Sequence, residues 1–197
     1  DFFRFIDTMR DRYQDDSQVM QIGGSAFVRT SQLKDAYYRS AYPLIWGWAT
    51  WKRAWEDFDL SMPAWPKTKK ELEQNPIGKP ELHARFLRQI EKTYQGKVNT
   101  WDYPFVAHIL SKHGHCITPH YNLISNIGFG KAATHAKNDK NPLANIPFDP
   151  LPNHIAKLDS QTIDKKKSGT QLNNGLYRRN SIEKRIHKFS CWLGFQK

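Results

Sequence analysis

The stretch Val19-Met20-Gln21-Ile22-Gly23-Gly24 decides the fold, and the rest of the chain can be interpreted outward from it. A short apolar run that two glycines stop is typical of a buried β-strand. On its N-terminal side, apolar side chains recur at three- and four-residue steps, which predicts an amphipathic helix over residues 2–14. A helix that leads directly into a buried strand favours a layered α/β architecture over a helix bundle or a β-sandwich.

The same pattern continues on the C-terminal side of the strand. Helical spacing predicts helices over residues 81–94 and 101–112, the second with Thr100 as its N-cap, and a short strand follows at 115–117. Tryptophans at positions 48, 51 and 55 also have helical spacing, so we expect a helix over 49–58.

Composition narrows the class of protein. The chain has 197 residues with 30 Lys and Arg against 19 Asp and Glu, a net charge of +11, and 13% aromatic residues. So many aromatic residues exclude a disordered chain, and no apolar run is long enough to predict a membrane-spanning helix or a signal peptide. With two cysteines in all, Cys116 and Cys191 are expected to stay reduced inside a cell.

The excess positive charge lies mostly in the last third, because residues 131–197 hold 13 Lys and Arg against 5 Asp and Glu. We expect three segments: a mixed-charge domain over 1–136, an irregular basic linker over 137–180, and a basic amphipathic helix within 181–197. The basic tail is compatible with a nucleic-acid arm, with attachment to an anionic membrane surface, or with a solvated tail.

The run Trp46-Gly47-Trp48 is the first candidate binding element. Two residues apart, Trp46 and Trp48 cannot share one helix face, and indole faces stack well on sugar rings or nucleobases. Gly47 would allow a tight bend and close approach by a ligand. The alternative is that these tryptophans belong to the core, which we favour for Trp51 and Trp55.

Three further groups could carry chemistry. Asp102 follows Trp101 at a helix start, where a carboxylate is either a general base beside an aromatic wall or simply stabilised by the helix dipole. The loop Asn126-Ile127-Gly128-Phe129-Gly130, with His135 beyond it, could cradle a diphosphate, although an ordinary turn is the simpler interpretation. The third group consists of possible soft-metal ligands, but their spacing fits no standard zinc site. Its members are His113, His115, Cys116 and His120.

Taken in order, these motifs resemble a known family of enzymes. Val19–Gly24, the aromatic stretch 42–55, Thr100-Trp101-Asp102-Tyr103 and the 122–135 segment are similar to bacterial nucleotide-sugar glycosyltransferases of the hemolytic-protein-like or family 2 groups. The likeness covers residues 1–136 and extends more distantly to N-acetylglucosaminyltransferase I, an inverting enzyme. It implies the C-terminal, acceptor-side portion of a GT-A fold, an α/β architecture with a mixed sheet flanked by helices.

The resemblance also implies roles for individual residues. Asp102 would be the general base that takes the proton from the acceptor hydroxyl, in a single inverting displacement without a covalent sugar intermediate. Trp46, Gly47, Trp48 and Trp101 would line the sugar site. His135 would be a possible ligand of Mg²⁺ or Mn²⁺, and a group of loop residues would lie near the diphosphate: Asn126, Gly128, Phe129 and Gly130.

In such enzymes the acidic metal-binding motif comes before the segment that opens this chain. We therefore expect the chain alone to lack transferase activity. The resemblance further implies a nucleotide-sugar donor, a glycan or lipid-linked acceptor, and a role in bacterial cell-surface polysaccharide synthesis. It implies a cytoplasmic protein. Separately, the basic amphipathic helix expected at 181–195 would either hold the protein peripherally on the inner membrane, by binding anionic lipid, or pack its apolar side chains on its own domain.

Two other functions remain open from the residues alone. A non-catalytic carbohydrate- or nucleotide-binding module could use the same tryptophans without turnover. A nucleic-acid-binding protein is less favoured, because the positive charge lies in the tail and is not interleaved with the aromatic residues, so we expect no nucleic-acid partner.

Overall fold

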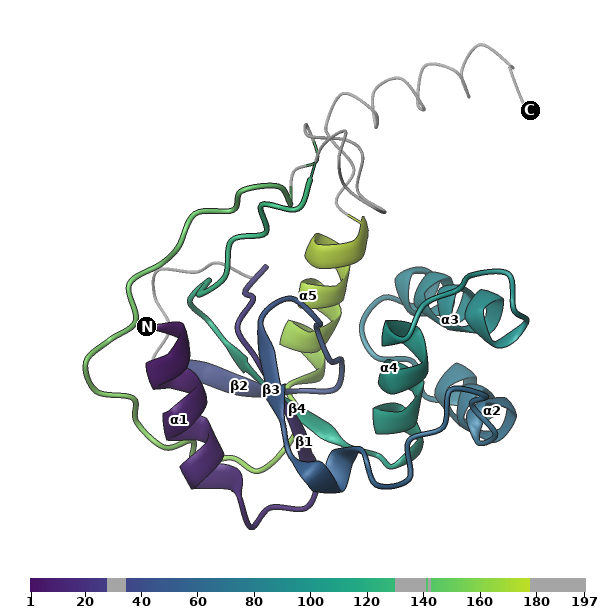
Figure 1. Cartoon of the computed structure of the whole chain (residues 1–197), viewed down its shortest axis with the longest axis horizontal. Coiled ribbons are helices and arrows are strands. Elements are labelled where there is room, and N and C mark those ends of the chain that lie inside the picture. The colour runs from purple at the N-terminus through teal and green to yellow at the C-terminus, as the bar shows by residue number, and fades with distance from the viewer. Residues whose placement is uncertain (28–34, 130–140, 142, 178–197) are drawn as a thin grey trace.

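A computed structural model describes residues 1–27, 35–129, 141 and 143–177 of the chain. These residues form an α/β arrangement in which helices lie on both faces of one sheet (Figure 1). The elements follow in the order α1 (Phe2–Tyr13), β1 (Val19–Gly23), β2 (Tyr37–Ser40), β3 (Trp48–Thr50), the 3₁₀ turn η1 (Lys52–Ala54), α2 (Trp65–Gln74), α3 (Pro80–Tyr94), α4 (Asp102–Ser111), β4 (His115–Pro119) and α5 (Lys165–Tyr177). The α/β class expected from the sequence is thus confirmed.

The sheet is mixed, with the strand order β2-β4-β1-β3. The central strands β1 and β4 run parallel, whereas β2 and β3 each pair antiparallel with their one neighbour. Ile22 lies opposite Ile117 of β4 on one side and Ala49 of β3 on the other. All five residues of β1 are buried, as expected for a strand covered on both faces.

One face of the sheet packs against α1. Phe5 and Met9 are completely buried and meet Ile22 and Ile117 there. Each such side chain contributes about 1.5–3 kcal/mol through burial, which explains why the amphipathic spacing specifies this helix. The irregular segment after residue 143 completes the same core through Leu151.

The opposite face is covered by α4, with Phe105 and Ile109 packed on Met20 and Cys116. Outside α4 lie α2 and α3, on the side of the molecule away from α1 (Figure 1). Beside them, α5 lies along β2, where the backbone N–H of Ala41 donates to Ser168 Oγ at 3.2 Å.

The expected helix over 49–58 is wrong. Residues 48–50 form β3, which pairs with β1, and Trp51 has extended dihedral angles (φ −111°, ψ 156°) before the short turn η1. Backbone pairing of β3 with β1 therefore outweighs the helical spacing of the tryptophans, which arises by coincidence. α2 starts at Trp65 with Pro66 in its first turn, a position that proline tolerates.

The expected linker over 137–180 is also wrong in part. Although residues 146–164 contain no helix or strand, α5 is a regular helix whose side chains Ser168, Gln171 and Leu172 are buried. The segment contains few apolar residues, and α5 is joined to the rest of the fold largely through polar and backbone contacts. Its sequence therefore gives little indication of a helix. The predicted helix at 181–195 lies outside the described residues. No helix in the described ranges is long and apolar enough to span a membrane.

Candidate functional site

A cavity of about 160 Å³ lies between α4, α3, α5 and the loop that follows β2. Two residues singled out from the sequence, Trp46 and Asp102, line it together although they are far apart in the chain. The described residues of its lining are Phe27, Pro43, Leu44, Ile45, Trp46, Phe86, Asp102, Tyr103, Val106 and Leu172. Among them, mostly apolar side chains surround one carboxylate.

Asp102 is the first residue of α4, where the positive end of the helix dipole stabilises a carboxylate. Its Oδ1 atom accepts hydrogen bonds from the hydroxyl of Thr100 and from the backbone N–H of Tyr103, the latter at 2.7 Å. Within the described part of the chain, Oδ2 has no hydrogen-bond partner. One oxygen thus fixes the orientation of the carboxylate and leaves the other available to a ligand.

The expected N-cap is displaced by one residue. Trp101 occupies that position with no side-chain hydrogen bond to the helix, and the Thr100 hydroxyl bonds to Asp102 instead. Tyr103 follows in the cavity wall, where burial, with the nearby Asp102 charge, raises the pKa of its phenol. Its hydroxyl therefore stays protonated at neutral pH.

Trp46 is held by two aromatic rings. Phe27 and Phe129 meet it edge-to-face, with ring centroids 5.7 Å and 5.8 Å away. The Phe129 contact brings the described part of the 126–130 loop next to Trp46 in the cavity wall. Ser25 Oγ donates to the Trp46 carbonyl oxygen at 2.8 Å and fixes the backbone there.

Trp48 lies in a different environment from Trp46. Its ring packs near Trp55, Phe105 and Trp101, with centroids 6.1, 5.4 and 5.9 Å away. Neither Trp48 nor Trp101 lines the cavity, and Trp101 remains 47% exposed. The expected common sugar site of Trp46 and Trp48 is therefore divided, because β3 begins between them and turns their side chains to different neighbours.

Gly47 is required by packing at this point. Its φ of +55° is in the left-handed region, and a β-carbon there would lie 2.2 Å from Cγ1 of Ile124. The close approach that glycine permits is thus made by Ile124, where the sequence analysis expected a ligand.

The described residues of the expected diphosphate loop, 126–129, make two polar contacts within the protein. The backbone N–H of Gly128 donates to Asn126 Oδ1 at 2.8 Å, and the carbonyl oxygen of Asn126 accepts from Asn145 N at 3.1 Å. The N–H of Gly128 is therefore already used, and a role of this loop at a diphosphate stays a prediction. Gly130 and His135 lie outside the described residues.

The histidines and the cysteine considered as metal ligands have other surroundings. His115 Nδ1 accepts from Arg39 at 3.3 Å, and His120 stacks on Tyr38 with centroids 4.8 Å apart. Complete burial raises the pKa of the Cys116 thiol. No group of three or more His, Cys, Asp or Glu side chains in the described ranges is arranged to hold a metal ion.

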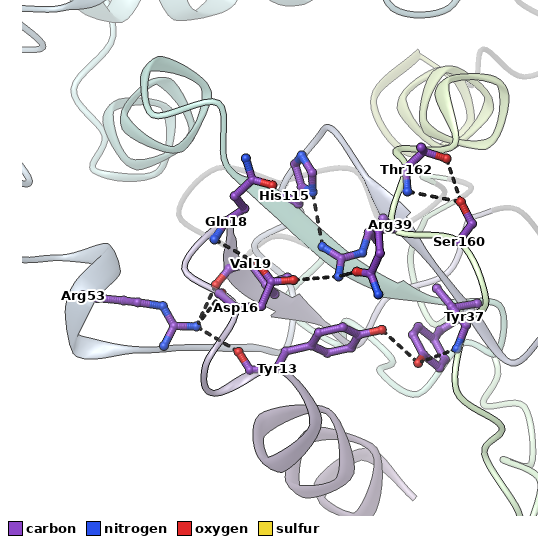
Figure 2. A network of polar contacts seen from close by, with 12 residues as sticks. Tyr13, Asp16, Gln18, Val19, Tyr37, Arg39, Arg53, His115, Ser160 and Thr162 are labelled. Carbon is purple, nitrogen blue, oxygen red and sulfur yellow. Dashed lines mark hydrogen bonds and ion pairs between the residues drawn. The ribbon is translucent and has the colours of Figure 1, made fainter.

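A polar network around Arg39 was not anticipated from the sequence. Figure 2 shows its guanidinium pointing toward Asp16 and His115, and the ion pair with Asp16 measures 2.7 Å. Burial opposes ionisation of Asp16, but the hydrogen bond and charge of Arg39 outweigh it and lower the pKa of this carboxyl. Burial and the Arg39 charge lower the pKa of His115. The two terminal nitrogens of Arg39 contact His115, Asp16 and Gln161, whereas its buried Nε has no hydrogen-bond partner among the described residues.

The contribution of α5 to the cavity wall was not expected from the sequence. Leu172 faces the cavity, while Gln171 accepts from the backbone N–H of Phe27 at 2.8 Å and donates to the carbonyl oxygen of Ser25 at 3.1 Å. Two leucines, Leu172 and Leu176, in an otherwise largely polar helix give only a weak pattern to detect. By contrast, the run Pro43-Leu44-Ile45-Trp46 is visible as four apolar residues.

Comparisons with known proteins add no relative: no family of proteins, no curated protein and no solved structure matches this chain.

Proposed function

We propose that this chain forms the acceptor-side part of an inverting glycosyltransferase that uses a nucleotide-diphospho-sugar as donor. The observation that carries the proposal is the meeting of Asp102 and Trp46 in one cavity, with Asp102 Oδ2 unpartnered among the described residues. A carboxylate fixed on a helix start, beside an indole and facing a cavity, suits a general base that acts on a hydroxyl group.

In the proposed reaction, the acceptor hydroxyl lies at Asp102 Oδ2. Its oxygen forms a bond to the anomeric carbon of the donor sugar, while the bond from that carbon to the diphosphate oxygen breaks. The hydroxyl proton passes to Asp102, and the nucleoside diphosphate leaves with the bonding electron pair. One displacement inverts the anomeric configuration and requires only one base.

Thr100 and the backbone N–H of Tyr103 act as positioning groups in this proposal. Both bind Oδ1 and so direct Oδ2 toward the acceptor. Preorganisation of this kind reduces the entropic cost of bringing the base to the hydroxyl.

Mg²⁺ or Mn²⁺ is part of the same proposal through the resemblance alone. The described residues contain no suitable group of three ligands, so they do not fit the metal and no step above involves it. His135 stays a predicted ligand.

The test compares Asp102→Asn with Glu81→Gln in the complete natural protein that contains this sequence. Glu81 is a matched control, since it lies in the first turn of α3, is exposed and does not line the cavity. Release of nucleoside diphosphate from UDP-, GDP- and dTDP-sugars would be measured with Mg²⁺ or Mn²⁺ present. Loss of a general base lowers the rate by about 10²–10⁴-fold, which is the expected effect of Asp102→Asn.

Either of two results would overturn the proposal. One is release by Asp102→Asn at the rate of the Glu81→Gln control. The other is absence of release from every donor with the wild-type protein.

A carbohydrate-binding module without catalysis is the second candidate. The 47% exposed indole of Trp101, beside Trp48 and next to Asp102, favours it, because an exposed indole face stacks on a sugar ring. This candidate predicts glycan binding that Trp101→Ala abolishes, with no release of nucleoside diphosphate from any donor.

A further inference from the structure

We infer that the cavity beside Asp102 binds an alcohol whose hydroxyl is carried by an apolar group about the size of a six-membered carbon ring. That this alcohol is the acceptor rests on the proposed function. The binding itself follows from the lining, the volume and the free carboxylate oxygen.

The lining selects against a diphosphate and against a fully hydroxylated sugar. Its walls include Leu44, Ile45, Phe86, Val106 and Leu172, and Asp102 is the charged member of the described lining. A diphosphate needs cations or free N–H donors, and next to Asp102 it would meet a like charge. Each sugar hydroxyl pressed against these aliphatic walls would lose its water without gaining a hydrogen-bond partner, which opposes binding.

The volume sets the size of the apolar group. At about 160 Å³, the cavity is close to the dimensions of known apolar cavities that take up a single small ring. An engineered cavity of about 150 Å³ lined by Leu, Ile and Phe binds benzene. A cyclohexyl, phenyl or branched alkyl group of similar size therefore fits here.

The carboxylate adds the requirement for a hydroxyl. Asp102 Oδ1 is already occupied by Thr100 and Tyr103, so the acceptor position offered to a ligand is Oδ2. A ligand that fills the apolar walls and donates one hydrogen bond to Oδ2 satisfies the described part of the lining. Such a pose also places its oxygen where the proposed base would take the proton.

The experiment titrates ¹⁵N-labelled protein with three probes in the absence of any sugar donor. They are cyclohexylmethanol, methyl β-glucoside as a polar ring of comparable size, and inorganic pyrophosphate. Cyclohexylmethanol should shift the amide signals of cavity residues such as Tyr103 and Val106, and the other two should not.

Variants of residues inside and outside the cavity test whether cyclohexylmethanol binds there. Leu44→Trp, which fills the cavity, should weaken cyclohexylmethanol binding at least about tenfold, with Ile45→Trp as the substitute if the first variant does not fold. Leu60→Trp is the matched control, since Leu60 is 62% exposed and does not line the cavity, and it should leave binding unchanged. Asp102→Asn should weaken binding several-fold through loss of the charge-assisted hydrogen bond.

The inference fails if methyl β-glucoside or pyrophosphate binds the cavity as tightly as cyclohexylmethanol, if cyclohexylmethanol leaves the cavity amides unshifted, or if the filling variants bind it like Leu60→Trp. Because no donor is present, these outcomes are independent of nucleoside diphosphate release. A protein that binds cyclohexylmethanol but releases no diphosphate would contradict the proposed function alone.

Discussion

Gly78 and Gly169 lie in direct contact: a β-carbon added to Gly169 would be 2.5 Å from the Cα atom of Gly78. Gly78, whose φ is +81°, belongs to the loop before α3, and Gly169 lies in the second turn of α5. The absence of both side chains lets the helix approach the loop backbone closely. Since Leu172 of the same helix faces the cavity, this contact also sets the position of one cavity wall.

Replacing Gly169 by alanine should therefore destabilise the protein. In an unconstrained helix this change would stabilise by up to about 1 kcal/mol. Here the new methyl group meets backbone atoms that cannot move aside, and we expect a net loss of about 1–3 kcal/mol in the free energy of unfolding. Urea denaturation measures it, with Thr170→Ala at the neighbouring exposed position as a control; equal stability of the two variants would contradict the contact.

Gly47→Ala should destabilise for two reasons that can be separated. Its φ of +55° strains any residue with a β-carbon, and that carbon would collide with Ile124. Together these effects should cost about 2–4 kcal/mol. In the double variant with Ile124→Ala the collision is removed, so the combined loss should fall short of the sum of the single losses by about 1 kcal/mol or more. Strictly additive losses would show that Ile124 is not the obstacle.

Asp16→Asn should weaken the network of Figure 2, because Arg39 is only 2% exposed and depends on this carboxylate. Breaking a fully buried ion pair costs about 3–5 kcal/mol, and the 30% exposure of Asp16 reduces the expected loss to about 1–3 kcal/mol. Asp15→Asn, next in the chain and exposed, should change stability by less than about 0.5 kcal/mol. The stability of the two variants is compared by thermal and urea unfolding. Equal losses would show that the Asp16–Arg39 ion pair does not stabilise the fold.

Acid should destabilise the fold partly through His120. Burial, with the nearby Lys167 charge, lowers its pKa from 6.5 to about 4, so the unfolded chain takes up a proton there at a higher pH than the folded one. The free energy of unfolding must then decrease as the pH falls from about 6.5 to about 4, by at most about 1.4 kcal/mol per pH unit from this one side chain.

His120→Phe should reduce that slope and keep the ring stack on Tyr38. Burial also lowers the pKa values of His83, His108 and His115, so the measured quantity is the difference in slope between variant and wild type. His154→Phe, at an exposed position, should leave the slope unchanged. A slope that His120→Phe does not alter would exclude His120 as a contributor.

The elements that sequence analysis located are those whose burial follows a regular period. Phe5 and Met9 of α1 and Phe86 and Ile90 of α3 point to one core face each, and the apolar run of β1 is buried throughout. The 49–58 prediction failed because the tryptophan spacing carried no information about the backbone pairing of Ala49 with Ile22. In α5, the described attachment runs through Ser168, Gln171 and Leu172, and the two polar residues among them carry no hydrophobic periodicity.

The residues of the candidate site could be predicted from the sequence, but their arrangement in space could not. Residue type identified Asp102 and Trp46, since a carboxylate at a helix start and an indole beside a glycine each suggest chemistry. Their meeting in one cavity depends on how α4 packs against the loop after β2, and local sequence does not encode that distance. Local sequence likewise does not show that Trp48, two positions after Trp46, packs against Trp55 and Phe105 outside the cavity.

The strand order β2-β4-β1-β3 constrains how the sheet can assemble during synthesis. While the chain leaves the ribosome, β1 and β3 can already pair, but the one neighbour of β2 among the described strands is β4, which begins about 75 residues after β2 ends. Until then the hydrogen-bonding edges of β1 and β2 are both open, and open edges invite pairing with other chains. The interval between synthesis of β2 and synthesis of β4 is therefore the period in which this protein most needs protection from aggregation.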